Sequence, residues 1–229
     1  MGFFNYHCHK FSSFKYLEMR LFFTALLFGS SFIAINAQDG KLVSECTVFY
    51  TVTIEGAKAD AGAAKPMEGT TKTVYIKGSK IRNDLESPGF RQTTIYDLKS
   101  DSTVVLREVG SAKYISYLDN NQRKEKNRKY EGIEFTVTNE KKTILGYGCI
   151  KVIAKLTDGS SFNVFYTPSI IPTNLQYEYQ FKDLPGFVLE YEALTEDGKS
   201  KINYSATKIT LVPVPVAKFD LPKTGYRVL

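Results

Sequence analysis

Two glutamates, Glu190 and Glu192, form the arrangement in this chain that comes nearest to a catalytic pair. They lie two positions apart in the run FVLEYE, residues 187–192. On a β-strand both side chains point to the same side, about 7 Å apart, and inverting glycosidases separate their two carboxyl groups by ~6.5–9.5 Å. A strand with a polar outer face carries two acids in the same way, and we favour this second interpretation.

Other catalytic groups are missing from residues 38–229. Both histidines of the chain, His7 and His9, lie before this region, and nucleophilic triads and catalytic zinc sites depend on imidazole groups. The region has no glycine-rich phosphate loop, and its segment LTDGSS lacks the ligand series of a calcium loop. We therefore expect a protein that is not an enzyme, with no metal and no cofactor.

The first 37 residues have the pattern of an export signal. Arg20 supplies a positive charge, an apolar run covers residues 21–35, and small or aliphatic residues precede a cut before Gln38. This run is shorter than the roughly 20 residues that a spanning helix needs, although a retained anchor is the alternative. We predict an N-terminal extension plus a cleaved signal at 1–37, and a single domain at 38–229 that is periplasmic or extracellular.

The charge and cysteine content of residues 38–229 limits the partners. The region has 27 Lys and Arg against 23 Asp and Glu, a net charge of +4. This excess is too small to indicate a nucleic-acid partner. Its two cysteines, Cys46 and Cys149, suggest one disulfide in an exported protein. The alternative is two buried thiols that behave as small apolar side chains.

A basic run, NNQRKEKNRKYEG, occupies residues 120–132. Such a run usually faces water, so we interpret it as the tip of a hairpin. The functional alternative is contact with anionic lipid head groups or with an acidic partner. The residues for that contact are Arg123, Lys124, Lys126, Arg128 and Lys129.

Most of residues 38–229 fall in runs where apolar and polar side chains alternate, which is the period of a β-strand. Cys46, Val48, Tyr50, Val52 and Ile54, for example, share one face of ECTVFYTVTIE. Further runs rich in β-branched and aromatic residues lie at 71–77, 90–98, 102–109, 112–118, 132–138, 149–157, 161–167, 187–194 and 201–212. Turn signals at 78–79, 110–111, 158–159 and 197–198 separate neighbouring runs and indicate hairpins.

About ten strands joined in this way predict an antiparallel meander, and a sheet of that size curls, closes or splits into two layers. We predict a mainly β fold in which a curled sheet forms a half-open barrel, with a sandwich as the second choice. Residues 56–69 indicate a flexible loop or a short helix over the sheet. Residues 167–176 contain two prolines and cannot be a central strand.

The pair Pro185-Gly186 precedes the strand that carries the two glutamates. It fits the two central positions of a type II turn, in which Gly adopts a positive φ. Phe187, Leu189 and Tyr191 are then expected to point inward, and the two glutamates outward.

Four stretches together resemble one group of exported proteins. KKTILGYGCIKVIAKLTDGSSFNVFYTPSI, residues 141–170, is similar to the middle of proteins in the LolA/LolB-like superfamily. LPGFVLEYE, residues 184–192, resembles the Leu-Pro-Gly segment of the secreted GLPGLI group. YIKGSKIRNDL (75–85) and the tail KFDLPKTGYRVL (218–229) are similar to an early hairpin and to the closing segment of these families. The resemblance covers about residues 45–228.

The resemblance implies a half-open antiparallel barrel around an apolar cavity, often with a short lid helix. Better-known members carry lipids or lipid-modified proteins across the envelope. We therefore expect an exported periplasmic or envelope protein that holds an acyl chain, a lipid or a lipidated partner and contacts the membrane surface peripherally. The alternative is a structural or interaction protein of the envelope or secretion apparatus without a small-molecule ligand.

One face of the strands is expected to line the cavity, because it carries large apolar side chains that suit a hydrophobic ligand. The predicted ligand-binding residues are Val48, Tyr50, Val52, Phe135, Val152, Phe162, Val164, Phe187 and Leu189.

Overall fold

The computed structural model describes residues 40–55, 69–195 and 200–229. The chain divides into two units, Met1–Ala37 and Gln38–Leu229, and every described residue belongs to the second. The predicted export signal, residues 56–68 of the predicted loop and the turn at 197–198 lie outside the described residues.

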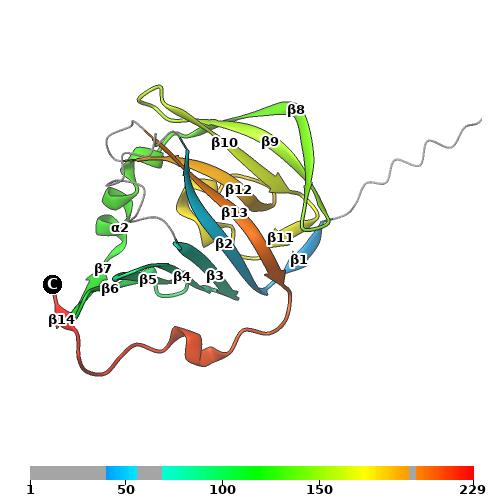
Figure 1. The fold of residues 1–229 in the computed structure, drawn as a ribbon. Helices are drawn as coiled ribbons and strands as arrows, with labels where there is room; N and C mark the ends of the chain where they lie inside the picture. Colours follow the sequence, from blue (N-terminus) through cyan, green and yellow to red (C-terminus); the bar gives the residue numbers. More distant parts are fainter. Residues whose placement is uncertain (1–39, 56–68, 196–199) are drawn as a thin grey trace, which may run out of the picture. The chain divides into compact units, whose positions relative to one another are not determined.

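Strands make up most of the described chain, and its helices are short (Figure 1). The strands are β1 (Lys41–Val43), β2 (Glu45–Glu55), β3 (Thr71–Lys77), β4 (Lys80–Ser87), β5 (Phe90–Asp97), β6 (Ser102–Val109), β7 (Ala112–Leu118), β8 (Glu134–Ile144), β9 (Tyr147–Lys155), β10 (Ser161–Thr167), β11 (Ile170–Pro172), β12 (Phe187–Leu194), β13 (Lys201–Thr210) and β14 (Arg227–Val228). The helical elements are α2 (Asn120–Lys126) and the 3-10 helices η1 (Arg128–Tyr130), η2 (Leu175–Tyr177), η3 (Tyr179–Phe181) and η4 (Val216–Phe219).

Twelve of the described strands form one sheet, in the order β14, β7, β6, β5, β4, β3, β2, β13, β12, β10, β9, β8. Neighbouring strands within this sheet are antiparallel, except that β14 runs parallel to β7. The sheet therefore combines two meanders, β2 to β7 and β8 to β13, joined where β13 pairs with β2. The sheet is not closed, and the predicted mainly β fold with a curled, half-open sheet is confirmed.

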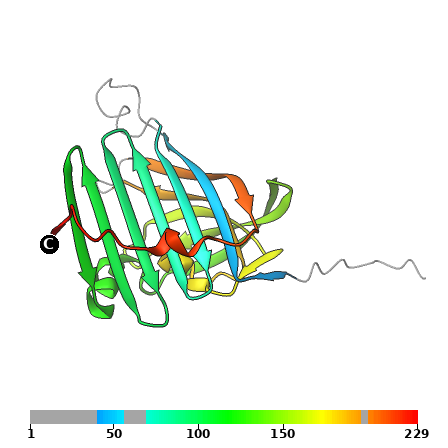
Figure 2. The same cartoon turned by 90° about the horizontal axis from the view of Figure 1, so that it is seen from below.

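The sheet curls along β2 and β13, so that it has a concave and a convex face (Figures 1 and 2). Register shows which side chains share a face, because residues directly opposite each other on paired strands point to the same side. Tyr50, Lys72, Leu85 and Gln92 are successive partners across β2, β3, β4 and β5, and all four lie on the concave side. Tyr50, one of the residues expected to line a cavity, thus lies on the concave face.

Residues 170–186, which we call the inner segment, pack against the concave face of β2, β13, β12 and β10. Tyr177 stacks on Phe187 with ring centroids 4.5 Å apart, and Phe181 meets Tyr191 edge-on at 5.0 Å. The hydroxyl of Tyr177 accepts a hydrogen bond from the backbone N–H of Val188 at 2.9 Å. Side chains of the inner segment therefore fill one half of the curl.

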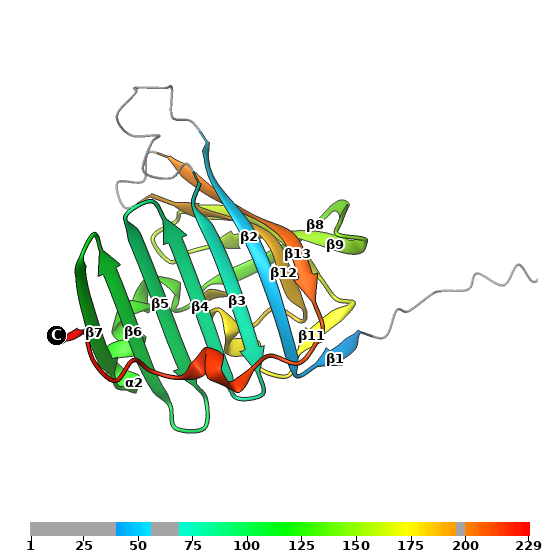
Figure 3. The same ribbon diagram turned by 60° about the horizontal axis from the view of Figure 1, so that its bottom comes forward.

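The C-terminal segment after β13 crosses the convex face of β3 to β7 (Figure 3). Phe219 of η4 packs with Ile95 and Val214, and Tyr226 packs against a cluster that contains Val104. These contacts cover apolar side chains on the outside of the sheet. Side chains on the convex face of this half of the sheet are therefore packed against the C-terminal segment.

Pro185 and Gly186 do not form the predicted type II turn, because Gly186 does not adopt a positive φ. Its N–H instead donates to the carbonyl of Leu184 at 2.9 Å. A Cβ atom on Gly186 would lie 2.3 Å from the carbonyl oxygen of Thr167. Glycine is needed here because two backbone segments approach closely. The predicted reason, a positive φ in a type II turn, is wrong.

The basic run forms α2 and η1, and the predicted hairpin tip is therefore wrong. Asp119 caps the helix by accepting a hydrogen bond from the N–H of Gln122 at 2.8 Å, and the Gln122 side chain accepts one from the N–H of Asp119 at 3.0 Å. This capping box is readable in the sequence as Asp-Asn-Asn-Gln. The spacing of cap residues, rather than the charge of the run, was the signal for this helix.

Candidate functional site

The unfilled half of the curl contains a cavity of about 360 Å³. Its walls come from the concave face of β3 to β7, from Tyr204 of β13, from α2 and from residues 176–180 of the inner segment. Small-molecule sites typically occupy ~300–1,000 Å³. The cavity is therefore large enough for a small ligand or for one end of a larger one.

Three lines of paired residues form the floor of the cavity. They are Ile81, Tyr96, Thr103 and Leu118; then Asn83, Thr94 and Val105; then Leu85, Gln92 and Arg107. Four of these side chains are aliphatic and the others are polar, charged or, for Tyr96, a ring with a hydroxyl group. The floor is thus amphipathic, where the sequence predicted an apolar lining.

Arg123 of α2 forms part of the cavity wall, and only 12% of its side chain is exposed. Its guanidinium lies 4.3 Å from the ring centroid of Tyr96 and donates a hydrogen bond to Asp101 at 3.1 Å. The Tyr96 hydroxyl donates to the same carboxylate at 3.1 Å. Burial raises the pKa of Tyr96, Arg123 opposes this and Asp101 adds to it, so that the net shift is upward and the phenol stays neutral.

Three buried polar atoms of cavity-lining residues have neither a hydrogen-bond partner nor an ion-pair contact of their own within the described part of the chain. They are Thr103 Oγ1, Asn83 Oδ1 and Arg123 Nε. A buried polar atom without a partner costs about 1–3 kcal/mol. The wall therefore has hydrogen-bonding capacity that a ligand, after a small local shift of the side chains around it, can use.

An ion pair between Lys72 of β3 and Glu178 ties the inner segment to the sheet, and each side chain is 11% exposed. Lys72 Nζ donates its hydrogen bond to the Tyr191 hydroxyl at 2.7 Å and lies 5.3 Å from the ring centroids of Tyr191 and Tyr204. Burial, and then the charge of Glu178, raise the pKa of Tyr191 well above its ordinary value. The hydroxyl therefore stays neutral and accepts from the lysine.

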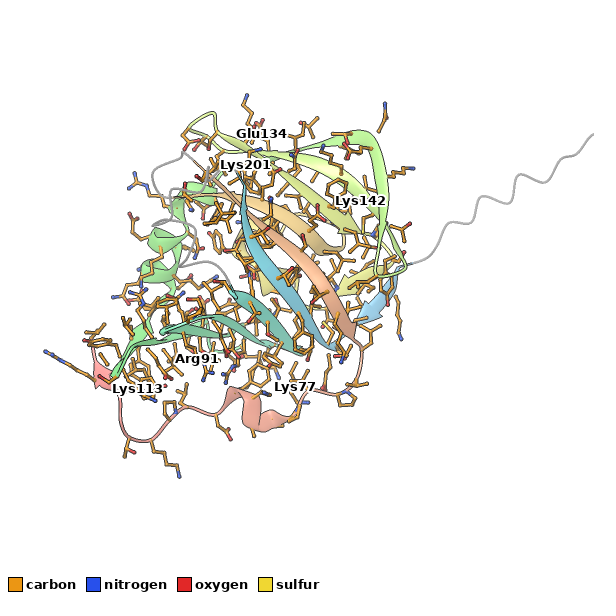
Figure 4. The ribbon with its side chains drawn as sticks, viewed as in Figure 1. Lys77, Arg91, Lys113, Glu134, Lys142 and Lys201 are labelled. Carbon is orange, nitrogen blue, oxygen red and sulfur yellow. The ribbon has the colours of Figure 1, made fainter. Side chains whose placement is uncertain are left out.

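Glu190 and Glu192 point away from the concave face, and each is paired with a lysine. Lys142 of β8 contacts Glu190 at 2.5 Å, and Lys201 of β13 contacts Glu192 at 2.9 Å. The two lysines are labelled in Figure 4. Burial acts to raise the pKa of Glu192, but hydrogen bonds from Lys201 and Asn163 outweigh it and hold the pKa below its ordinary value. A general acid needs a raised pKa, so Glu192 is poorly suited to that role.

A second cavity of about 380 Å³ lies beside Glu192, between the ends of β9, β10 and β12 and η1. Its lining includes Tyr130, Leu156 and Phe162. Phe162 is the only one of the nine predicted ligand-binding residues that lines either of these two cavities.

The nine predicted ligand-binding residues belong to β2, β8, β9, β10 and β12. Eight are buried and Phe135 is half-buried. Two hydrophobic clusters hold eight of them: Val48, Tyr50, Phe187 and Leu189 in one, and Phe135, Val152, Phe162 and Val164 in the other. Val52 is also buried, beside Tyr204 in the register. Their role in ligand binding stays a prediction, because the structure shows them packed against protein.

Cys46 and Cys149 are both buried and free. The predicted disulfide is therefore not formed, and the alternative of two buried thiols describes the structure. Burial raises the pKa of Cys46 to about 12 and that of Cys149 to about 11. Because the thiolate is the reactive form, we expect neither cysteine to react readily.

The five basic residues around α2 do not form one charged face. Arg123 and Lys126 line the first cavity, and Lys129 lines the second. Lys124 and Arg128 are exposed. Contact of this run with an anionic surface stays a prediction. Sequence reasoning treated the run as uniformly solvated and so missed the inward position of Arg123.

Among the described residues, no group of three or more His, Cys, Asp and Glu side chains is arranged to hold a metal ion. In the same part of the chain, no helix is both long enough and apolar enough to cross a membrane.

Comparison with known proteins gives likenesses in fold. A protein from Thermus thermophilus, described as uncharacterized and conserved, matches with a TM-score of 0.45 and 10% identity, over 81% of this chain and 90% of that chain. PNGF-II matches at 0.44 and 15%, over 80% and 30% of the two chains. MucB in complex with MucA(peri) matches at 0.41 and 12%, over 78% and 54%. No protein-family model and no curated protein matches.

The chain spans 30% of the length of PNGF-II and 54% of that of MucB. At these TM-scores and identities the likenesses concern the arrangement of strands and identify no ligand.

Proposed function

We propose that this protein is an exported envelope protein that holds an amphiphile, such as a lipid or a lipidated partner, in the cavity on its concave face. The cavity carries the proposal: the curl leaves about 360 Å³ unfilled, although the inner segment fills the other half. A core that served stability alone would gain from closing such a space, because unfilled volume reduces packing energy.

The distribution of side chains on the cavity floor supports an acyl chain as the apolar part of the ligand. Ile81, Leu85, Val105 and Leu118 come from three different strands and line one continuous cavity. An acyl chain lying over them would lose contact with water, and each buried methylene contributes about 0.8 kcal/mol. The polar residues between them then face the head group.

The role that we propose is not catalytic. Glu190 and Glu192 point away from the cavity and are engaged by lysines. Tyr96 has a pKa above its ordinary value, so it is poorly suited to act as a base near neutral pH.

The alternative, an interaction protein without a small ligand, would use the free edge of the sheet at β8. This edge carries charged residues, among them Glu134, Lys141 and Lys142, and its register shifts between Val137 and Lys141. Charges and bulges are the devices by which edge strands avoid pairing with other chains. The edge at β8 is therefore poorly suited to pair with another chain, and we prefer the ligand-binding function.

Filling the cavity tests the proposal. The change Val105→Phe adds a ring to the floor, and Val137→Phe makes the same change on β8, where Val137 is 64% exposed and lines neither cavity. We expect Val105→Phe to weaken binding of the neutral amphiphile monolauroylglycerol by about tenfold or more, because the ring occupies the site. Isothermal titration calorimetry on the full chain measures this effect.

The control variant Val137→Phe is expected to bind monolauroylglycerol like the unaltered protein. Thermal unfolding by circular dichroism checks that both variants fold. Equal affinities for all three proteins would show that the cavity is not the binding site.

A further inference from the structure

The acidic residues that line the first cavity are already paired. Glu178 is in ion-pair contact with Lys72. Asp84 accepts a hydrogen bond from Arg82 at 2.8 Å and another from Thr93 at 2.7 Å. Neither carboxylate is left to balance other cations around the cavity.

Two cationic side chains around the cavity are not paired with a carboxylate of the described chain. Arg107 and Lys126 both line it, and neither has a carboxylate within ion-pair distance among the described residues. The guanidinium of Arg107 donates to the neutral amide of Gln92 at 2.9 Å. Both cations are exposed, so a ligand can reach them from solution. The cavity therefore carries an excess of positive charge that attracts an anion.

The buried wall offers donors of the kind that an oxyanion takes. Arg123 Nε carries a hydrogen without an acceptor, and the Thr103 hydroxyl, on a residue only 4% exposed, has no partner within the described chain. Charged donors form the strongest hydrogen bonds with phosphate and carboxylate oxygens. Asn83 differs, since its Nδ2 donates to the carbonyl of Tyr177 at 3.3 Å and its Oδ1 is an unused acceptor. An acceptor at this position fits a hydroxyl group on the ligand.

We infer that the cavity selects amphiphiles whose head group is an oxyanion beside a hydroxyl, the chemistry of a monoacylglycerol phosphate. Arg107 and Lys126 attract the anion, Arg123 and Thr103 donate hydrogen bonds to it, and Asn83 accepts one from the neighbouring hydroxyl. The inference rests on the proposed function and adds the chemistry of the polar end of the ligand.

Three matched probes test the inference on the full chain: monolauroylglycerol phosphate, monolauroylglycerol and glycerol 3-phosphate, each below any critical micelle concentration. We expect the acylated phosphate to bind about tenfold more tightly than the neutral acylglycerol at low salt. This preference is expected to shrink as salt rises, because the exposed cations are screened.

Variants show which residues cause the preference for the acylated phosphate. The double change Arg107→Gln and Lys126→Gln is expected to lower the preference for phosphate from about tenfold to about threefold, since Arg123 and Thr103 still donate. Lys124→Gln, an exposed position on the same helix that does not line the cavity, is expected to leave the preference unchanged. Thr103→Val keeps the shape of the side chain and removes the hydroxyl, and we expect a loss of about threefold for the phosphate only. Both cation changes are at exposed positions, so folding is expected to be retained.

The outcomes separate this inference from the proposed function. Equal binding of monolauroylglycerol and its phosphate to the unaltered protein overturns the oxyanion inference and leaves the acyl site. Binding of glycerol 3-phosphate as tight as that of the acylated phosphate overturns the acyl site and leaves the oxyanion site. Absence of binding by all three probes overturns both.

Discussion

Replacing Lys72 by Met is expected to lower the free energy of unfolding by about 3 kcal/mol, because breaking a buried ion pair leaves an uncompensated charge. Glu178 would remain between the inner segment and the sheet without its cation, and Tyr191 would lose the ammonium group that donates to its hydroxyl at 2.7 Å. Urea unfolding followed by circular dichroism measures the change. Since this pair lies at the boundary between the filled half of the curl and the cavity, its loss is also expected to weaken ligand binding.

A matched change on the same strand provides the control. Lys77 pairs with Glu45 at 2.8 Å, but these side chains are 26% and 30% exposed, and Lys77→Met is expected to cost less than about 1 kcal/mol. The double change Lys72→Met and Glu178→Leu should recover most of the stability, because an apolar pair replaces a buried ionic one. If the double variant is less stable than Lys72→Met alone, the unpaired charge is not the cause of the loss.

Gly186→Ala is expected to destabilise the protein by about 3 kcal/mol, because overpacking at a site that cannot relax forces the backbone to move. The new Cβ would lie 2.3 Å from the Thr167 carbonyl oxygen and 2.9 Å from the Tyr166 ring. The contact joins the end of β10 to the start of β12, where the inner segment returns to the sheet. Thermal unfolding by circular dichroism measures the effect.

Gly148→Ala is the corresponding control, since Gly148 lies on β9 with no atom within 4 Å of an added Cβ and without a positive φ. We expect this change to leave the unfolding temperature nearly unaltered. Equal unfolding temperatures for the two variants would contradict the argument that Gly186 is required by close backbone approach.

The strands were predictable because alternation of apolar and polar residues is a local property. Runs such as 45–55, 102–109 and 161–167 coincide with β2, β6 and β10. The alternation of apolar and polar residues did not predict β4, because this strand has three polar residues in succession, Arg82, Asn83 and Asp84. On its convex side, Arg82 donates a hydrogen bond to the carbonyl of Lys218 in the C-terminal segment, and on its concave side Asn83 lines the cavity between Ile81 and Leu85. The polar residues of β4 therefore have partners and surroundings that only the tertiary structure supplies.

The site was only partly predictable. The role of the nine predicted apolar residues stays a prediction. Several of them pack in clusters with side chains of the inner segment, which nothing in TPSIIPTNLQ placed there. The cavity lies instead on the neighbouring strands, where side chains such as Thr94 and Gln92 resemble those of a solvated face. Arg123 was read as a surface charge, since its stacking on Tyr96 depends on a contact between residues 27 positions apart in the sequence.

The position of the bound acyl chain tests the central claim most directly. Nuclear Overhauser contacts between the chain of monolauroylglycerol and the protein methyl groups report which half of the curl it occupies. We predict contacts with Ile81, Leu85, Val105 and Leu118, on the floor of the first cavity. Contacts confined to Val152 and Val164 would contradict the account, because they would show that the ligand displaces the inner segment and leaves the cavity empty.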